Sequence, residues 1–268
     1  MSSFVTALKS YGQHFLNDKG VLDNIVKVVR SLYNQEQLVE IGPGTGALTA
    51  PLLNEFGSLT CIEVDKRCID LLKEKFKISI EKDPQDLRII DADFLKLDIS
   101  VLANMPTAIV GNFPYNISSQ IVFRILDNYK QIPFMVGMFQ KEMGHRIGAP
   151  HGSKEYGVIS VLTQLFYDVK VEFDIPPECF SPAPKVMSSI ISMKRKENIV
   201  LDFDYKLFRT VVKSGFGQRR KMLRNGLSGI ASKDLLQDPF FQKRAEQLSV
   251  KDFVDLTKRI EQDIKNRK

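Results

Sequence analysis

The sequence predicts an α/β protein with a mostly parallel sheet, followed by a small helical part at its carboxyl end. Apolar runs typical of buried strands alternate with amphipathic helical segments along residues 38–139. A glycine-rich loop at residues 42–46 separates an early strand from the helix after it. Strands that alternate with helices in this way are joined by right-handed crossovers, and this order favours a parallel sheet.

Length and composition are compatible with one large domain and one small one, because 43% of the 268 residues are apolar. No apolar run approaches the roughly 18 residues that a membrane span needs, and the amino terminus lacks the pattern of a secretory signal. Cys61, Cys68 and Cys179 are widely spaced, without a Cys/His cluster. We therefore expect a cytoplasmic protein without a disulfide framework, a metal site or a membrane partner.

Charge is distributed unevenly along the chain. Residues 1–193 carry 19 Lys and Arg against 22 Asp and Glu, a net charge of −3. Residues 194–268 carry 19 against 10, a net charge of +9. We expect two domains, residues 1–195 and residues 196–268, and the basic second one is typical of nucleic-acid binding. The alternative is a basic surface without a partner.

The glycine-rich loop follows the strand predicted at residues 38–41. Glycines let a backbone pass close to a ligand, and the amino terminus of the following helix presents free N–H groups. We expect this helix to open at Thr45 or just after it. The Gly42-x-Gly44 spacing alone is a weak signal, but its position between a strand and a helix strengthens it.

Two acidic residues lie at the ends of the next two strands. Glu63 lies 21 residues after Gly42, in the strand predicted at residues 59–65, where a carboxylate can accept both hydroxyls of a ribose. Asp93 follows the strand predicted at residues 87–90 and can accept from an adenine amine. The alternative for Glu63 is an ordinary solvated carboxylate at a strand end.

The most informative stretch is Asn112-Phe113-Pro114-Tyr115, which lies between an apolar strand and a helix predicted over residues 117–126. Pro114 fixes its own φ and cannot donate a backbone hydrogen bond, so this is a stiff turn at the carboxyl end of a strand, where α/β sheets bind ligands. The turn offers an amide, a carbonyl and a flat aromatic ring. These groups can hold an exocyclic amine and stack on its ring. The alternative is an ordinary Pro-containing turn with a surface Tyr.

The remaining elements of the first domain follow from their patterns. Asp18 is the expected N-cap of a helix, and residues 134–139 form a fully apolar strand of the kind that parallel sheets contain. Residues 77–86 are expected to be a polar connection. The Gly-, Pro- and Ser-rich residues 148–157 are a candidate mobile lid.

A proline-rich segment at residues 175–186 separates two further strands, at residues 169–173 and 188–193, which we expect to pair antiparallel. With four prolines the segment is expected to be a rigid loop without regular structure. It contains Phe180, an aromatic ring held near the edge of the sheet. The alternative for Phe180 is a hydrophobic plug under the loop.

The second domain contains the densest basic run of the chain. Arg219, Arg220, Lys221 and Arg224 all lie within residues 218–225. Arg220 and Arg224 are four residues apart, so on a helix they share one face that suits a line of phosphates. The alternative is a solvated helix face, and the position of the run in the +9 segment favours RNA.

These motifs together resemble the class I S-adenosylmethionine-dependent methyltransferases, and more closely the ribosomal RNA adenine dimethyltransferase family, small-subunit branch. The combination of Asn-x-Pro-Tyr with the proline-rich Phe loop is specific for methylation of an adenine amine. The matching segments are residues 12–16, 39–46, 62–65, 93–95, 112–118, 180–186 and 218–221, which together span nearly the whole chain.

The resemblance implies a Rossmann-like sheet of seven mostly parallel strands with the last strand antiparallel, and a small all-α carboxyl-terminal domain. It implies S-adenosylmethionine as cofactor and S-adenosylhomocysteine as product. The implied cofactor contacts are His14 and Leu16 from an amino-terminal arm, Gly42 and Gly44 near the methionine end, Glu63 at the ribose, Asp93 at the adenine amine and Asn112 near the sulfonium. Where this chain has His14, the family often has Asn.

In the chemistry that the resemblance implies, Asn112 and the Pro114 carbonyl accept the two hydrogens of the target amine. Tyr115 and Phe180 stack on opposite faces of an adenine pulled out of its stack. The implied substrate is a pair of adjacent adenosines in the 3′-terminal hairpin loop of small-subunit (16S) rRNA, within an assembling 30S particle. Arg219, Arg220, Lys221 and Arg224 are the implied RNA contacts, and the protein is expected to be a monomer.

Three alternatives use part of the same pattern. A nicotinamide-dependent oxidoreductase could use the glycine loop and Glu63, but it leaves the Asn112–Tyr115 turn and the basic tail without a role. The second alternative is the related large-subunit rRNA adenine methyltransferase of the macrolide-resistance type, but the run at residues 218–223 favours the small-subunit branch. The third alternative is an RNA-binding assembly factor without enzymatic activity.

Overall fold

The structure is a computed structural model of the whole chain and describes residue 8 and residues 13–83, 85–102 and 105–267. It divides into two compact units, one of Met1–Gly144 with Asp168–Arg195 and one of His145–Tyr167 with Lys196–Lys268. One division falls between Arg195 and Lys196, where the sequence analysis places its domain boundary. Residues 145–167 belong to the second unit, whereas that boundary assigns them to the first domain. Residues 145–167 belong to the second unit because helix α7 (Val158–Phe166) packs against α8 (Tyr205–Gly217) and α10 (Val250–Asn266).

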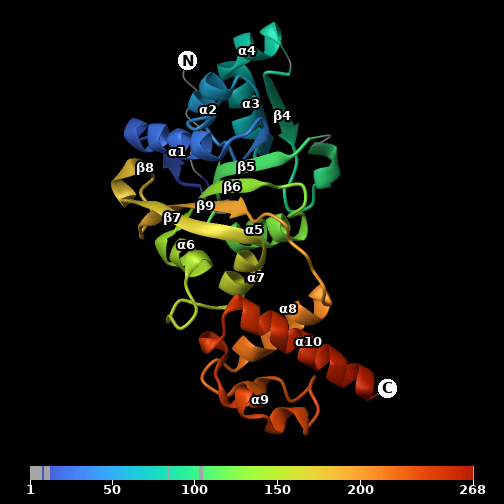
Figure 1. Cartoon of the computed structure of the whole chain (residues 1–268). Helices are drawn as coiled ribbons and strands as arrows, with labels where there is room; N and C mark the ends of the chain where they lie inside the picture. Colours follow the sequence, from blue (N-terminus) through green and yellow to red (C-terminus); the bar gives the residue numbers. More distant parts are fainter. Residues whose placement is uncertain (1–7, 9–12, 84, 103–104, 268) are drawn as a thin grey trace. The chain divides into compact units, whose positions relative to one another are not determined.

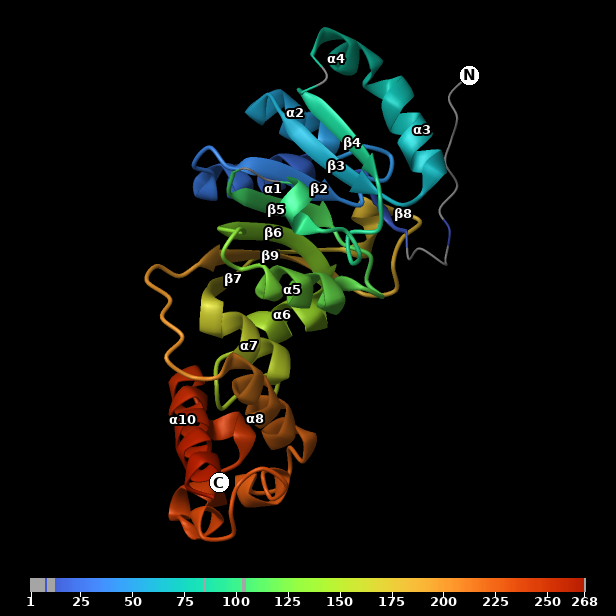
Figure 2. The ribbon, with the colours of Figure 1, turned by 90° about the vertical axis from the view of Figure 1, so that its right-hand side faces the viewer.

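Within the described residues of the first unit, seven strands form one sheet in the order β4-β3-β2-β5-β6-β9-β7 (Figure 2). Pairing is parallel from β4 through β6 and antiparallel between β6 and β9. This arrangement confirms the expected mostly parallel sheet with an antiparallel last strand. The strands are β2 (Gln37–Ile41), β3 (Leu59–Glu63), β4 (Leu87–Asp91), β5 (Thr107–Asn112), β6 (Phe134–Gln140), β7 (Tyr167–Ile175) and β9 (Ser188–Arg195).

The strand order explains where a ligand can bind. After β2 the chain builds the sheet on one side through β3 and β4, and it then crosses over to place β5 on the other side of β2. In α/β sheets a ligand binds at this switch point, beyond the carboxyl ends of the strands. Glu63 ends β3, Asp93 follows β4 and Asn112 ends β5, so these three residues lie at the same edge.

Among the helices of the first unit, α1 begins at its predicted cap and α2 begins later than expected. Asp18 caps α1 (Lys19–Leu32) by accepting from Val21 N at 2.9 Å. α2 (Thr49–Phe56) starts four residues later than expected, because Gly46 has a φ of +71°, which a right-handed helix excludes. The others are α3 (Lys66–Lys75), α4 (Lys77–Lys82), a 3₁₀ turn at Ile99–Leu102, and α5 (Ser118–Asp127). The polar connection expected at residues 77–86 therefore contains a short helix.

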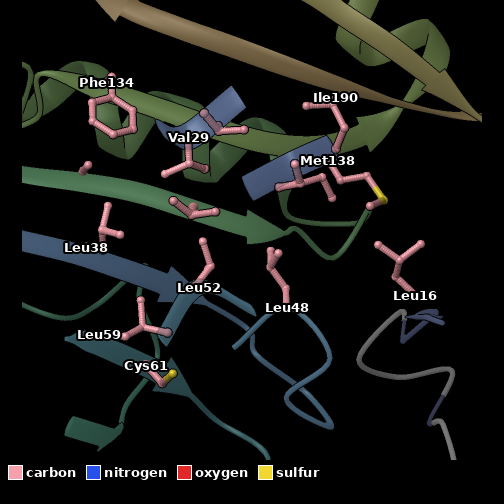
Figure 3. Packing of buried hydrophobic residues seen from close by; sticks show 14 of the residues in the cluster. Leu16, Val29, Leu38, Leu48, Leu52, Leu59, Cys61, Phe134, Met138 and Ile190 are labelled. Atoms are coloured by element: carbon pink, nitrogen blue, oxygen red, sulfur yellow. The ribbon is translucent and has the colours of Figure 1, made fainter. Parts of the chain in front are cut away.

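The core cluster of this unit lies on one face of the sheet, because it takes alternate residues from each strand. Side chains from α1, α2 and the strands form one buried cluster, in which Val29, Leu52 and Cys61 are fully buried (Figure 3). Leu16, near the amino terminus, and Ile190 of β9 belong to the same cluster. The amino-terminal arm is thus attached to the sheet by apolar contacts as well as by hydrogen bonds.

The proline-rich segment contains regular structure that the sequence analysis does not predict. A 3₁₀ turn at Pro177–Cys179 precedes the short strand β8 (Phe180–Ser181), which pairs antiparallel with β1 (Phe15–Leu16). Phe180 and Ser181 fall between the prolines, and their backbones are therefore free to pair. The pair β1–β8 connects the amino-terminal arm to the loop before β9. Gly12, in the arm motif, lies outside the described residues.

The second unit is helical and contains the second half of α6 (Lys141–Gly148), then α7, α8, α9 (Leu223–Gly226) and α10, with 3₁₀ turns at Leu235–Gln237, Pro239–Gln242 and Ala245–Gln247 (Figure 1). Its core contains aliphatic and aromatic side chains, and the rings of Phe216 and Phe253 stack with their centroids 5.8 Å apart. No helix in the described part of the chain is long and apolar enough to cross a membrane.

The loop at residues 148–157 is held within the second unit. Gly152 N donates to Glu246 O at 2.7 Å, and Arg219 donates to the carbonyls of Ser153 and Lys154. Tyr156 is 1% exposed. These contacts contradict the expectation of a mobile lid.

Candidate active site

A cavity of about 290 Å³ lies within the first unit at the switch point of the sheet. Its lining contains every cofactor residue that the resemblance implies, together with two residues of the stiff turn: His14, Leu16, Gly42, Gly44, Glu63, Asp93, Asn112, Pro114 and Tyr115. These residues come from the arm, the glycine loop, the ends of β3 and β5 and the turn after β4. The fold therefore brings together residues that lie up to a hundred positions apart.

The glycine loop forms one wall of the cavity, and its backbone needs glycine. Gly42 and Gly44 have φ angles of +66° and +54°, values that side chains rarely permit. A Cβ on Gly44 would lie 2.9 Å from the ring of Phe15, so the arm packs directly on the loop. A ligand in the cavity can consequently approach the loop backbone closely.

Glu63 organises the loop with its carboxylate. Its Oε2 accepts from Gly44 N at 3.1 Å, and its Oε1 accepts from Val64 N at 2.8 Å and from Asp65 N at 2.9 Å. A carboxylate has about four lone-pair positions, so Glu63 keeps capacity for a ligand hydroxyl. Its fixed orientation fits the ribose contact expected from the sequence.

Asp93 occupies the turn after β4. Its Oδ1 accepts from Leu95 N at 2.9 Å, and its Oδ2 lies 3.6 Å from Lys96 Nζ. The carboxylate is half-buried and borders the cavity. It is an acceptor in reach of a ligand amine that enters the cavity.

A second carboxyl group in the cavity wall, Glu40, is not singled out by the sequence analysis. It is 2% exposed, and its Oε2 accepts from Thr49 Oγ1 at 2.6 Å and from Cys61 Sγ at 3.7 Å. Burial raises the pKa of Glu40 to about 7, against the opposing effect of these hydrogen bonds. The signal in the sequence is an acidic residue between Val39 and Ile41, in an otherwise apolar strand.

The stiff turn is anchored by Phe113. Its ring is 1% exposed and packs against Gly137 of β6, so closely that a Cβ at Gly137 would collide with it. Gly111 and Gly137 are direct partners in the β5–β6 register. Small residues at these two positions leave room for the ring, and the buried ring fixes the direction of the following turn.

The amide of Asn112 is oriented by the arm. Its Nδ2 donates to the backbone carbonyl of His14 at 2.8 Å. Because a carbonyl accepts only, this contact identifies the nitrogen side of the amide and leaves Oδ1 as an acceptor for another group. The cavity therefore has a directed amide oxygen beside Pro114 and Tyr115.

Tyr115 is held from two directions. Its hydroxyl lies 2.6 Å from Ser188 Oγ, and its ring stacks on the imidazole of His14 with centroids 5.6 Å apart. His14 Nδ1 donates to Pro182 O at 2.8 Å. Burial raises the pKa of Tyr115, so the phenol stays neutral at physiological pH. Sequence reasoning identifies Tyr115 but not Ser188, because nothing local connects the two.

Phe180 is not where the resemblance places it. Its ring is 4% exposed, belongs to the buried cluster and does not line the cavity. The pairing of Leu16 with Phe180 in β1–β8 holds it there. In this structure Phe180 is a packing residue that fixes the arm, which corresponds to the hydrophobic-plug alternative.

The basic run is divided by the structure of the second unit. Arg219 is committed to an ion pair with Glu246 at 3.0 Å and to two backbone carbonyls. Arg220 lies in a turn between α8 and α9, so it does not share a helix face with Arg224 as expected. Arg220, Lys221 and Arg224 instead border one depression in the surface.

Within the described residues, no group of His, Cys, Asp or Glu gathers in a way that could hold a metal ion.

Comparison with protein families gives one match over most of the chain. The model of the family described as "Ribosomal RNA adenine dimethylase" matches residues 5–262. The chain is 45% identical over 255 residues to ribosomal RNA small subunit methyltransferase A of Cytophaga hutchinsonii, covering 94% of this chain and 96% of that protein. It is 46% identical over 261 residues to the protein of the same name from Flavobacterium johnsoniae, covering 97% of each.

Two solved structures share the fold. A dimethyladenosine transferase from Plasmodium falciparum superposes with a TM-score of 0.80 at 24% identity, covering 93% of this chain and 98% of that one. The 23S rRNA methyltransferase ErmE superposes with a TM-score of 0.71 at 21% identity, covering 92% and 99%. At these identities the likeness shows the architecture alone, and it agrees with the α/β class predicted from the sequence.

Proposed function

Because the chain belongs to the ribosomal RNA adenine dimethylase family, we propose that it dimethylates the N6 amines of two adjacent adenosines in the 3′-terminal hairpin loop of small-subunit 16S rRNA. The relatives' names support the small-subunit rRNA substrate. The observation that carries the chemistry is the Asn112 amide, which donates to His14 O at 2.8 Å and so leaves Oδ1 free to accept at the cavity wall.

S-adenosylmethionine fits the donor and acceptor groups of this cavity. Glu63 would accept from a ribose hydroxyl with its remaining lone pair and Asp93 from the adenine amine, while Gly42 and Gly44 would allow close approach of the amino-acid end. His14 and Leu16 would cover the ligand from the arm. When bound, the cofactor supplies a methyl group on a positively charged sulfur, and S-adenosylhomocysteine is the product.

The side chains around the amine site do their work by hydrogen bonding and positioning. An adenine amine is a poor nucleophile because its lone pair is delocalised into the ring. Asn112 Oδ1 and the Pro114 carbonyl would accept its two hydrogens and localise that lone pair. Pro114 O already accepts from Ile117 N at 3.1 Å, which leaves its second lone pair for the amine. No titrating base is needed in this scheme.

Tyr115 would stack on the target adenine with one face only. His14 already covers the other face of the ring, at 5.6 Å between centroids. A single aromatic face is worth on the order of 1–3 kcal/mol to a base taken out of its stack. Phe180 is left out of this scheme, because its ring lies in the buried cluster.

The second unit would supply the RNA contact. Arg220, Lys221 and Arg224 are exposed and border one depression, whereas Arg219 supports the local structure through Glu246.

We propose that the protein acts as a cytoplasmic monomer on an assembling 30S particle, with residues 1–195 as the catalytic domain and residues 196–268 as the RNA-binding domain. The helical segment at residues 145–167 joins the latter in the structure.

Replacement of Asn112 tests the proposal. In the Asn112→Ala variant we expect methyl transfer to 30S particles to fall below detection, while affinity for RNA is unchanged. Asn54→Ala, an exposed position on α2, is the matched control and should behave as the wild type. The readout is the dimethyladenosine content of the particles by mass spectrometry. Methylation by Asn112→Ala at close to the wild-type rate would refute the catalytic assignment.

Two further measurements separate the alternatives. S-adenosylmethionine should raise the melting temperature of the protein and NAD should not, which excludes the oxidoreductase. Incubation with small-subunit and large-subunit particles, followed by mapping of methylated adenosines, separates the small-subunit activity from the macrolide-resistance type. Methylation of the large-subunit particles alone would overturn the proposed substrate.

A further inference from the structure

The second unit contains a depression of about 380 Å³ that lies between two segments of the chain. One wall is formed by residues 220–225 and the other by residues 242–247. Leu223 N donates to Lys243 O at 2.8 Å, and Arg219 pairs with Glu246, so the two walls are tied together at both ends. Leu223 and Ala245 are buried beneath them. The depression is therefore part of the folded unit and does not depend on loop closure.

Four cationic side chains surround this depression without being neutralised. Arg220, Lys221, Arg224 and Arg244 are all exposed, and among the described residues none of their side chains makes an ion pair or a hydrogen bond. The one carboxylate in the lining, Glu246, is already paired with Arg219. The depression thus carries a local positive charge that favours a phosphate group.

The lining also carries groups that a phosphate does not need. Asn225, Gln242 and Gln247 present amides to the depression, and Met222 adds an exposed apolar side chain. Gln247 Oε1 accepts from Arg244 N at 2.7 Å, which leaves its NH₂ group to donate. Amides and planar guanidinium groups are the side chains that contact the edges and faces of unpaired RNA bases.

We infer that this depression binds a single unpaired nucleotide of the RNA, with the phosphate on the arginines and the base against Met222 and the amides. The inference rests on the proposed function in taking RNA as the partner of the second unit. A volume of this order can hold one nucleotide. Arg244 and Gln242, which the basic motif at residues 218–225 does not include, then belong to the RNA site.

The test compares binding of two RNA probes to the full-length protein in the absence of cofactor. One is a duplex with a single bulged adenosine, and the other is the same duplex without the bulge. We expect the bulged RNA to bind more tightly, and Gln242→Ala and Asn225→Ala to weaken its binding roughly three- to ten-fold without changing the salt dependence. Arg244→Ala should weaken it further and lower the slope of log affinity against log salt by about 1.

Two control variants separate the effect of positive charge on RNA binding from the effect of the planar guanidinium group. Arg244→Lys keeps the charge but loses the planar group, so it should restore the salt slope but not the preference for the bulge. Lys233→Ala removes one exposed charge of the second unit outside the depression and should leave that preference intact. Thermal melting verifies that each variant is folded.

The outcomes distinguish this inference from the proposed function. If Gln242→Ala and Asn225→Ala bind both RNAs as the wild type does, or if the bulge gives no preference, the nucleotide site is refuted. The methylation test of Asn112→Ala does not depend on that result. If instead methylation persists in Asn112→Ala while the bulge preference depends on Gln242, the catalytic proposal fails and the nucleotide site stands.

Discussion

The hydroxyl of Tyr115 lies 2.6 Å from Ser188 Oγ and joins the turn after β5 to the first residue of β9. Ser188 is fully buried, and Tyr115 is the aromatic residue of the amine site. The position of the stacking ring is thus set by a strand that lies more than seventy residues further along the chain. Ser188 is a positioning residue in this arrangement, since its own side chain does not line the cavity.

Loss of this hydrogen bond should weaken catalysis without abolishing it. We expect Ser188→Ala and Tyr115→Phe each to lower kcat roughly two- to ten-fold, in line with one hydrogen bond, while the KM for the cofactor changes little. Because both changes remove the same contact, the double variant should be no worse than either single variant. Ser189→Ala is the control, because Ser189 lies next to Ser188 on β9 and its hydroxyl donates instead to Asp174 on β7. If the losses in kcat add up in the double variant, Ser188 and Tyr115 do not act through one shared hydrogen bond.

His14 should act through both its backbone and its ring. His14→Ala keeps the carbonyl that orients Asn112 but loses the contact to Pro182 O and the stack on Tyr115. We expect weaker cofactor binding and a lower kcat. His14→Asn retains an N–H donor for Pro182 O and should recover part of both. Calorimetry measures the affinity for S-adenosylmethionine, and initial rates measure kcat. If His14→Ala and His14→Asn lose both equally, the hydrogen bond to Pro182 O is unimportant.

Glu40 should make the free energy of unfolding depend on pH. Its pKa rises from 4.5 in the unfolded chain to about 7 in the folded protein, because the carboxyl is buried. Between these values the folded state binds more protons, so stability falls as pH rises from about 4.5 to 7 and the loss is complete above that range. The full effect is on the order of 3 kcal/mol. Urea unfolding at several pH values should show this fall in the wild type and a flatter profile in Glu40→Gln.

The control for this experiment is Glu55→Gln, which removes a carboxylate that is 39% exposed in an ion pair with Arg30. Its pH profile should follow that of the wild type. A profile of Glu40→Gln that matches the wild type from pH 4.5 to 7 would show that Glu40 does not hold its proton in the folded state.

Adjacent arginines of the basic run should have opposite phenotypes. Arg219→Ala removes a half-exposed ion pair and two contacts to carbonyls, so we expect a loss of about 1 kcal/mol in stability. Arg220→Ala should change stability by less than about 0.5 kcal/mol, but lower RNA affinity and reduce the salt slope by about 1. Thermal melting and fluorescence anisotropy measure the two effects. A large loss of RNA affinity in a folded Arg219→Ala protein would refute the assignment of Arg219 to local structure and of Arg220 to RNA binding.

Local patterns in the sequence are sufficient for the parts of the fold that depend on near neighbours. Asp18 caps α1 as expected, because an N-cap acts within three residues. The alternation of strands and helices predicts the parallel sheet, and the switch-point rule then places Glu63, Asp93 and Asn112 at one edge. All three border the same cavity.

Contacts between distant segments could not be predicted in this way. The sequence determined an α/β fold, the glycine loop and the amine-binding turn, since propensity, capping and strand order act along the chain. Only the tertiary structure decided that Phe180 packs beneath the arm, that Ser188 holds Tyr115 and that residues 145–167 join the helical unit. Each of these depends on which surfaces meet after folding, and no local pattern encodes the partner of a buried side chain.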